Sequence, residues 1–205
     1  MAGVCCLLFA WLTAAVVAGR TLAWDTRTLI AVAGSQRPWL TEVMRVTSVL
    51  GSGAVEIPVA LLLALWLSLR GRRSEASGYA AAALSGWALY GLAKYLVHRP
   101  RPHVVPHLMP DAGWYSYPSG HSALAPLVFG LGALVLASPW SSRAARVGIL
   151  ALAVLLTLAI ACSRVYLGVH WPTDVAGGLL LGTAWAAGWV SWWERAPGDR
   201  DQAAS

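Results

Sequence analysis

Long apolar runs, separated by short polar connectors, dominate the chain. Each run is close to the length of about 20 residues that a helix needs to cross a bilayer. They predict membrane spans near residues 4–24, 54–69, 76–97, 122–137, 147–162 and 175–193. The fold class predicted from this pattern is all-α: a polytopic membrane protein built as a six-transmembrane-helix bundle.

The segment between the first two runs, residues 25–52, has a mixed pattern. Its apolar residues recur at helical spacing with Thr41, Glu42 and Arg45 between them, which is typical of a helix lying in the membrane interface. These apolar positions are Trp39, Leu40, Val43, Val46 and Leu50. We therefore expect a short interfacial helical segment after the first span.

The first run, Val4 to Gly19, invites comparison with a signal peptide because small residues lie near its end. It has no basic segment in front, and further spans follow, so we interpret it as the first membrane helix. No change of composition marks a second domain. Residues 1–195 are thus expected to form a single transmembrane domain, followed by a disordered polar tail at 196–205.

Composition supports a membrane protein. Hydrophobic residues make up 58% of the chain and charged residues 12%, whereas soluble domains carry about 25% charged residues. The net charge of +6 predicts that the chain binds lipid head groups or an anionic substrate in the bilayer. Nucleic acid is not expected as a partner. Cys5 and Cys6 are adjacent and Cys162 lies in an apolar run, so no disulfide is expected.

The arginines suggest how the chain crosses the cytoplasmic membrane. The connectors at 70–73 and 138–146 are basic, which favours the cytoplasmic side for them and for both termini. Segments 98–121 and 164–174 then face outward together. Basic residues are at least as numerous on that outer face as on the cytoplasmic face. An anion-binding site on the outer face would account for them.

The polar segment between the last two runs carries the clearest chemistry. His170 and Asp174 are four residues apart, which on a helix places them on one face. Pro172 suits the first turn of such a helix. A carboxylate in this position accepts the Nδ1 proton of the imidazole and leaves Nε2 free as a nucleophile. By itself, the segment is equally consistent with a plain helix start stabilised by a buried His–Asp bond.

Two other segments add groups that bind anions. Lys94 ends the third run seven positions before Arg101, although a lysine there also suits the interface and the arginine a plain loop. Ser119, Gly120 and His121 open the fourth run. Ser119 is a good helix N-cap, Gly120 allows close approach to the backbone, and free N–H groups at a helix start attract phosphate. The simpler interpretation of this segment is a cap alone.

Taken together, the three segments place several cations, free N–H groups and two histidines on one membrane face. Arg164 adds a guanidinium that can pair with an oxyanion. Phosphoryl transfer needs this combination of charge stabilisation, a nucleophile and a proton donor for the leaving oxygen.

The order Lys-x6-Arg-Pro, Pro-Ser-Gly-His and Ser-Arg-x5-His-x3-Asp, over residues 94–174, resembles the type 2 phosphatidic acid phosphatase superfamily in its membrane-bound lipid phosphatase branch. The resemblance implies that His170 attacks phosphorus and forms a phosphohistidine, with Asp174 orienting it. It implies that His121 protonates the leaving group and then activates water. It assigns the phosphoryl oxygens to Lys94, Arg101, Ser119, Gly120 and Arg164.

The resemblance also implies that the reaction needs neither a metal nor another cofactor. The sequence has no carboxylate cluster of the kind that binds Mg²⁺. His98, His103 and His107 suggest zinc ligands, but their proline-rich loop offers no helical face, so a head-group contact or a plain loop role is favoured.

The predicted function is hydrolysis of a lipid phosphate or pyrophosphate. Family analogy favours undecaprenyl pyrophosphate, with phosphatidylglycerophosphate and phosphatidate as the other substrates. The alternatives are a phosphotransferase that uses the same residues and a non-enzymatic transporter with a basic outer pocket. The pattern predicts no particular oligomeric state. It leaves Glu56 either as a functional intramembrane acid or as a solvated acid at the rim.

Overall fold

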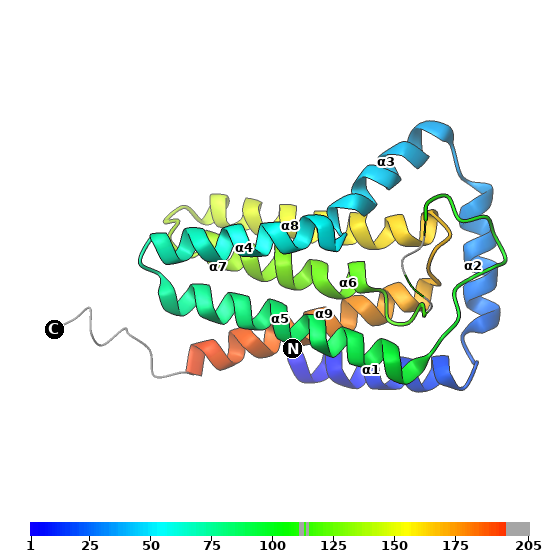
Figure 1. The fold of residues 1–205 in the computed structure, drawn as a ribbon, viewed down its shortest axis with the longest axis horizontal. Coiled ribbons are helices and arrows are strands. Elements are labelled where there is room, and N and C mark those ends of the chain that lie inside the picture. Colours follow the sequence, from blue (N-terminus) through cyan, green and yellow to red (C-terminus); the bar gives the residue numbers. More distant parts are fainter. Residues whose placement is uncertain (111–112, 114, 196–205) are drawn as a thin grey trace.

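The computed structural model describes residues 1–110, 113 and 115–195. All of its regular elements are helices, which lie side by side in an elongated bundle (Figure 1). They are α1 (Ala2–Val17), α2 (Leu22–Gly34), α3 (Pro38–Leu50), α4 (Gly53–Leu69), α5 (Arg73–Val97), α6 (Gly120–Ala125), the π-helical turn η1 (Pro126–Leu131), α7 (Gly132–Ala137), α8 (Arg143–Tyr166) and α9 (Pro172–Arg195). The all-α prediction is confirmed, while the tail predicted at 196–205 lies outside the described residues.

Two helices are long and apolar enough to cross a membrane. One is the continuous helix Gly120–Ala137, formed by α6, η1 and α7, and the other is α8. Two further spans are counted if each bent pair, α1 with α2 and α3 with α4, is one broken span. The described part of the chain therefore shows two to four spans by length and composition, and the number six stays a prediction.

The predicted first span is wrong at its end. α1 stops at Val17, and α2 begins at Leu22 after a bend of 94°. Gly19 makes this turn with φ of +70°, a conformation that glycine adopts at little cost. The apolar pattern continues across the turn, and for this reason it predicts one helix. The mixed segment that follows consists of two helices, α2 and α3, instead of one.

Glycines bring α9 against the start of α6. A Cβ added at Gly178 would lie 2.5 Å from the Ser119 carbonyl oxygen, and one at Gly177 would lie 2.6 Å from the Tyr117 ring. No larger residue fits without movement of the backbone or of the ring. This close packing fixes the N-terminus of α6 beside the first turns of α9.

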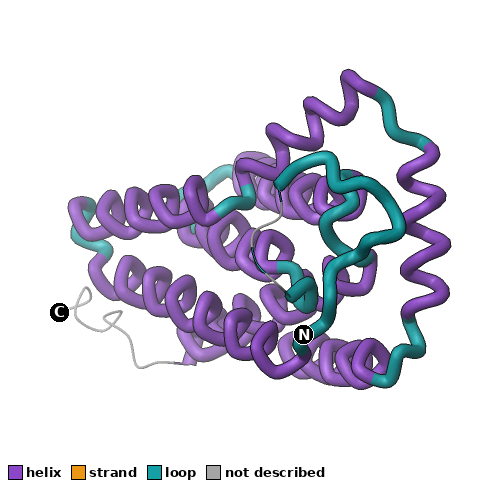
Figure 2. Tube along the Cα trace, turned by 45° about the vertical axis from the view of Figure 1, so that its right-hand side comes forward, coloured by secondary structure: helices purple, strands orange, loops and turns teal. Residues whose placement is uncertain are grey.

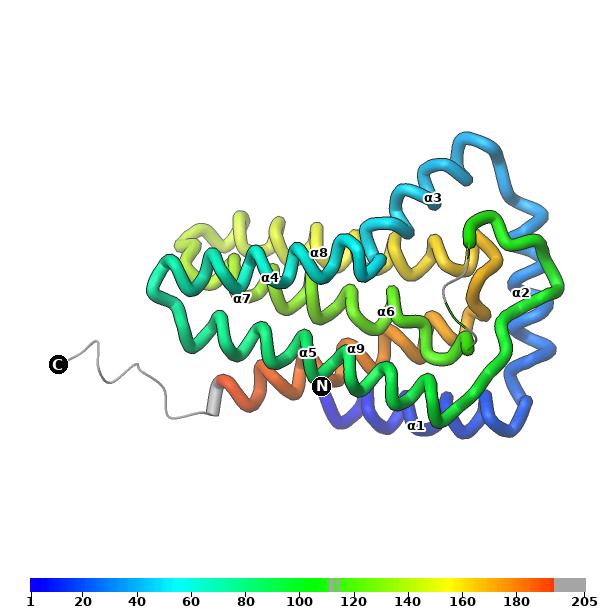
Figure 3. The backbone as a smooth tube through the Cα atoms, viewed as in Figure 1, coloured from blue at the N-terminus to red at the C-terminus, as the bar shows by residue number. Residues whose placement is uncertain are grey.

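The polar connectors fall into two groups at opposite ends of the bundle. α2, the loop 98–119 and the loop 167–171 lie at one end, and the α4–α5 and α7–α8 connectors lie at the other (Figures 1 and 3). Figure 2 shows the described part of the long loop 98–119 passing across the helix ends. The three chemistry-bearing segments thus share one end, away from the basic connectors.

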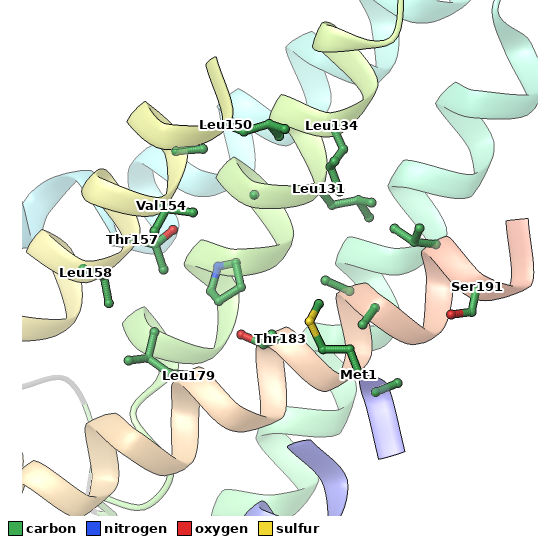
Figure 4. Close-up of a pocket in the computed structure, with 17 residues that line it drawn as sticks. Met1, Leu131, Leu134, Leu150, Val154, Thr157, Leu158, Leu179, Thr183 and Ser191 are labelled. Atoms are coloured by element: carbon green, nitrogen blue, oxygen red, sulfur yellow. The ribbon is translucent and has the colours of Figure 1, made fainter. Parts of the chain in front are cut away.

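An apolar cavity of about 680 Å³ lies between η1, α8 and α9, with Met1 at its edge (Figure 4). Its walls are mainly aliphatic, and hydroxyls of Thr157, Thr183 and Ser191 are among the few polar groups. None of the predicted site residues lines it. Its surface suits hydrocarbon chains and not a phosphate group.

Candidate active site

His170 lies in the short loop between α8 and α9 and is buried. The loop turns at Gly168, with φ of +77°, and a Cβ there would lie 2.7 Å from the Pro106 carbonyl oxygen. Because α9 begins at Pro172, the prediction that His170 and Asp174 share a helical face is wrong. Nevertheless, His170 Nδ1 lies 3.3 Å from Asp174 Oδ2, the contact that the spacing predicted.

Asp174 makes this contact by folding back over the helix start. Its Oδ2 accepts the Trp171 backbone N–H at 2.9 Å, as an acidic residue does in the first turn of a capped helix. The same oxygen therefore faces both the helix cap and the imidazole. His170 Nε2 is left on the other side of the ring, 3.3 Å from Arg101 Nη1.

The predicted cations gather around this imidazole. Arg101 is buried and donates from Nη1 to the Val169 carbonyl oxygen at 2.7 Å. Arg164 lies in the last turn of α8, is buried, and donates to the Ser48 hydroxyl of α3. Lys94, at the end of α5, donates from Nζ to the Tyr115 carbonyl oxygen at 2.7 Å. The end of α5, the loop that follows it and the distant helix α8 thus supply positive charge to one site.

Burial and these cations set the protonation of His170. Burial lowers its pKa well below the ordinary value of 6.5, and the charges of Arg164, Arg101 and Lys94 lower it further. A hydrogen bond with the Ser116 backbone acts weakly in the opposite direction. The imidazole is therefore neutral at physiological pH, which leaves a lone pair on Nε2 when Nδ1 carries the proton.

His121 stands in the first turn of α6, facing the same cluster. It is close enough to Arg164, His170 and Arg101 to interact with them electrostatically. The joint between α3 and α4 packs against it, since a Cβ at Gly51 would lie 3.1 Å from His121 Cδ2. The two predicted histidines therefore belong to one site.

Ser119 precedes His121 at the N-cap position, but its side chain makes no capping hydrogen bond. The prediction that its hydroxyl caps the helix is wrong. Its backbone N–H donates instead to the Asp174 carbonyl oxygen at 3.0 Å, which ties α6 to α9. The hydroxyl is buried and has no hydrogen-bond partner among the described residues. A buried hydroxyl without a partner suits a ligand oxygen.

Arg99 and Asp25 are the residues that the sequence did not reveal. Arg99 is buried between two carboxylates, 2.6 Å from Asp25 and 2.7 Å from Asp174. Asp25 is fully buried on α2. Ser48, the partner of Arg164, was missed as well. No motif or spacing rule in the sequence relates Asp25, Arg99 and Ser48 to the site. The one sequence feature that could have indicated Asp25 and Ser48 is a polar side chain among apolar neighbours.

The three loop histidines show no arrangement for a metal. His107 Nε2 lies 2.6 Å from the Pro102 carbonyl oxygen and its ring stacks near that of His103, while His98 touches the rings of Tyr95 and Tyr115. Within the described ranges, no three His, Cys, Asp or Glu side chains are grouped as metal ligands. A loop role fits these contacts.

Glu56 proves to be buried on α4, so its interpretation as a solvated acid at the rim is wrong. Neither carboxyl oxygen has a hydrogen-bond partner in the described part of the chain. The three cysteines are free, and two of them are exposed.

The assembled groups suit phosphoryl transfer. They comprise a neutral imidazole backed by a carboxylate, a second imidazole, three fixed cations and a free hydroxyl. Donors held in a buried place stabilise developing charge more strongly than they would in water. A tetrahedral oxyanion is the ligand that such a ring of donors binds best.

Comparisons with known proteins agree with this chemistry. The sequence matches the PAP2 superfamily over residues 75–197. Phosphatidylglycerophosphatase B of Bacillus subtilis (strain 168) is 29% identical over 180 residues, which cover 86% of each chain. Undecaprenyl-diphosphatase of Sulfolobus acidocaldarius is 38% identical over 107 residues, covering 49% of this chain and 44% of that protein.

A solved structure has the same fold. The crystal structure of a transmembrane PAP2-type phosphatidylglycerolphosphate phosphatase from Bacillus subtilis is similar with a TM-score of 0.89 and 26% identity, covering 97% of this chain and 98% of that one. The superfamily match spans more than half of the chain and includes every predicted site residue. The chain therefore belongs to the PAP2 superfamily and is a membrane phosphatase.

Proposed function

We propose that the protein hydrolyses a lipid phosphate or pyrophosphate through a phosphohistidine intermediate, without a metal. The observation that carries this proposal is the buried, neutral His170 with Nδ1 beside Asp174 and Nε2 beside Arg101. Nucleophilic catalysis requires a free lone pair, a group that orients the base, and charge at the phosphoryl oxygens. His170 supplies the lone pair, Asp174 orients the imidazole, and Arg101 is among the cations that supply the charge.

In the first step, His170 Nε2 forms a bond to phosphorus and the bond from phosphorus to the lipid oxygen breaks. His121 gives its proton to that leaving oxygen. Asp174 stabilises the positive charge that develops on the imidazole at Nδ1. The lipid product leaves as an alcohol, or as a lipid phosphate when the substrate is a pyrophosphate.

In the second step, a water oxygen attacks phosphorus and His121, now neutral, takes a proton from that water. The bond between phosphorus and Nε2 breaks, its electron pair returns to the imidazole, and inorganic phosphate is released. Throughout both steps the phosphoryl oxygens are held by the ring of donors. These donors are Lys94, Arg101, Arg164, the Ser119 hydroxyl and the Gly120 N–H.

We propose a phosphate ester with its tail in the bilayer as the substrate class. Phosphatidylglycerophosphate is the first candidate substrate, because the relative named phosphatidylglycerophosphatase B aligns over 86% of this chain. Undecaprenyl pyrophosphate comes second because the relative named for it aligns over 49%. Both substrates place a phosphoryl group at the interface, where the site lies in the proposed topology.

Phosphate release from a panel of lipid phosphates tests the function. We expect the purified protein in detergent to release inorganic phosphate from phosphatidylglycerophosphate, and to do so equally with and without a chelator. Loss of release with the chelator, restored by Mg²⁺, would contradict the metal-free reaction. Transfer of the phosphoryl group to an added lipid alcohol, with little free phosphate, would instead favour the phosphotransferase.

We also propose that the site faces outward and that both termini lie in the cytoplasm, because the basic connectors lie at the opposite end of the bundle. Val104 is exposed in the loop 98–119. In a variant without native cysteines, Val104→Cys is expected to react with an impermeant thiol reagent in intact cells. A matched Ser141→Cys variant in the α7–α8 connector is the control and should react only after permeabilisation; the opposite pattern would reverse the topology.

A further inference from the structure

Arg99 connects two buried carboxylates from different helices. Its Nη2 donates to Asp25 Oδ2 at 2.6 Å, and its Nη1 donates to Asp174 Oδ1 at 2.7 Å. The guanidinium also lies over the Trp171 ring, 5.3 Å from its centroid. A planar guanidinium fits this bridging role, because its donors point in fixed directions in one plane.

Asp25 binds the first turn of α9 as well. Its Oδ1 accepts the Thr173 backbone N–H at 3.0 Å, and its Oδ2 accepts the Thr173 hydroxyl at 2.7 Å. The first N–H groups of a helix have no partner within the helix, so this carboxylate from α2 satisfies one of them. α2 is thereby attached to the turn that contains Asp174.

Both oxygens of Asp174 are occupied as a result. Oδ1 accepts from Arg99, while Oδ2 faces the Trp171 N–H and His170 Nδ1. A carboxylate held on both oxygens cannot rotate about its last bond. Loss of Arg99 would free Oδ1 and let the group turn away from the imidazole.

We propose that Asp25 and Arg99 are positioning residues, which hold Asp174 so that His170 presents Nε2 to phosphorus. This inference rests on the proposed role of His170. In the described structure, the side chains of Asp25 and Arg99 form their hydrogen bonds with each other and with Thr21, Thr173 and Asp174. They therefore act on the reaction in two ways: by holding Asp174 in place, and through the electric field that their charges produce at His170.

The charges of Arg99 and Asp25 have opposite effects on the pKa of His170. The other charged or titratable groups around His170 are Lys94 of α5, Arg101 of the long loop, His121 of α6, Arg164 of α8 and Asp174 of α9. Removing the Arg99 charge leaves Asp174 less compensated, so the pKa of His170 rises. Removing the Asp25 charge lowers it. Since the nucleophile must be neutral, the acid limb of the pH–rate profile follows these shifts.

The test compares Arg99→Gln, Arg99→Lys and Asp25→Asn in the purified full-length protein. We expect Arg99→Gln to lower kcat by about 100-fold with a much smaller change in KM, as a misplaced nucleophile does. Its acid limb should move to higher pH, and that of Asp25→Asn to lower pH. Arg99→Lys retains the charge, so its acid limb should stay near that of the unchanged protein although kcat falls.

Arg27→Gln is the matched control, because Arg27 is an exposed arginine on α2, the helix that carries Asp25. In the described structure its side chain donates only to the Ala23 carbonyl oxygen of that helix. It should change neither kcat nor the pH profile.

His170→Ala, measured alongside, tests the proposed function: retained activity in this variant would refute the function itself. If His170→Ala is inactive while Arg99→Gln and Asp25→Asn behave like the unchanged protein, or shift the acid limb in the same direction, the positioning role is wrong. Should Arg99→Gln not fold, Asp25→Asn and Arg99→Lys decide the same question.

Discussion

Replacing His170 by alanine is expected to abolish phosphate release, with kcat at least about 10⁴-fold lower. The variant loses the atom that forms the bond to phosphorus, and no other buried imidazole in the described structure lies beside a carboxylate. The fold should persist, since the side chain belongs to a loop between two long helices. Phosphate release from the lipid panel and a thermal unfolding curve measure the two outcomes separately.

His103→Ala is the matched control for this prediction. His103 is exposed in the loop 98–119, and its ring stacks with that of His107. Its removal should leave the rate of phosphate release within the error of the assay. A His170→Ala protein that still turns over its substrate would remove His170 from the nucleophilic role.

The site was predictable where each of its parts is a local signature of a helix end. Lys94 ends one helix, Ser119 and His121 begin another, and Arg164 and Asp174 flank a short connection. Antiparallel helices of similar length bring alternate connectors to the same end, so these parts had to meet. The fold class followed for the same reason, from apolar runs that only helices can satisfy inside a bilayer.

The contacts that join distant segments were not predictable. Asp25 and Arg99 are 74 positions apart, and neither periodicity nor motif spacing relates them. An arginine at the start of a proline-rich loop looks like a surface charge until its partners are known. The capping role of Ser119 was not predictable either: its backbone N–H donates to the Asp174 carbonyl oxygen, and its hydroxyl is buried without a capping hydrogen bond in the described structure.

The number of membrane spans shows another limit of the pattern. α5 and α9 are each at least 24 residues long, yet of the described helices only α8 and Gly120–Ala137 are apolar enough to count as membrane spans by themselves. Both are rich in glycine and alanine, which helices use where they pack closely against one another. Mean hydropathy alone therefore does not identify every long helix of this bundle as a membrane span.

Replacing His121 by alanine is expected to separate the two chemical steps. With a lipid phosphate, whose alkoxide leaves poorly without a proton, turnover should fall by about 10²- to 10⁴-fold. With an aryl phosphate, whose leaving group needs no proton, the first step should proceed. The second step still lacks its base, so the phosphohistidine should accumulate.

Rapid quenching with a radiolabelled aryl phosphate measures this accumulation. His121→Ala should show a burst of one phenol per active site, and the label should remain on the protein in alkali and be lost in acid, as phosphoramidates are. The double variant that also carries His170→Ala should retain no label, because it lacks the nitrogen that would hold the phosphoryl group. Label retained by the double variant would place the covalent bond on another residue, and a His121→Ala protein that releases phosphate at the unchanged rate would show that the proton comes from elsewhere.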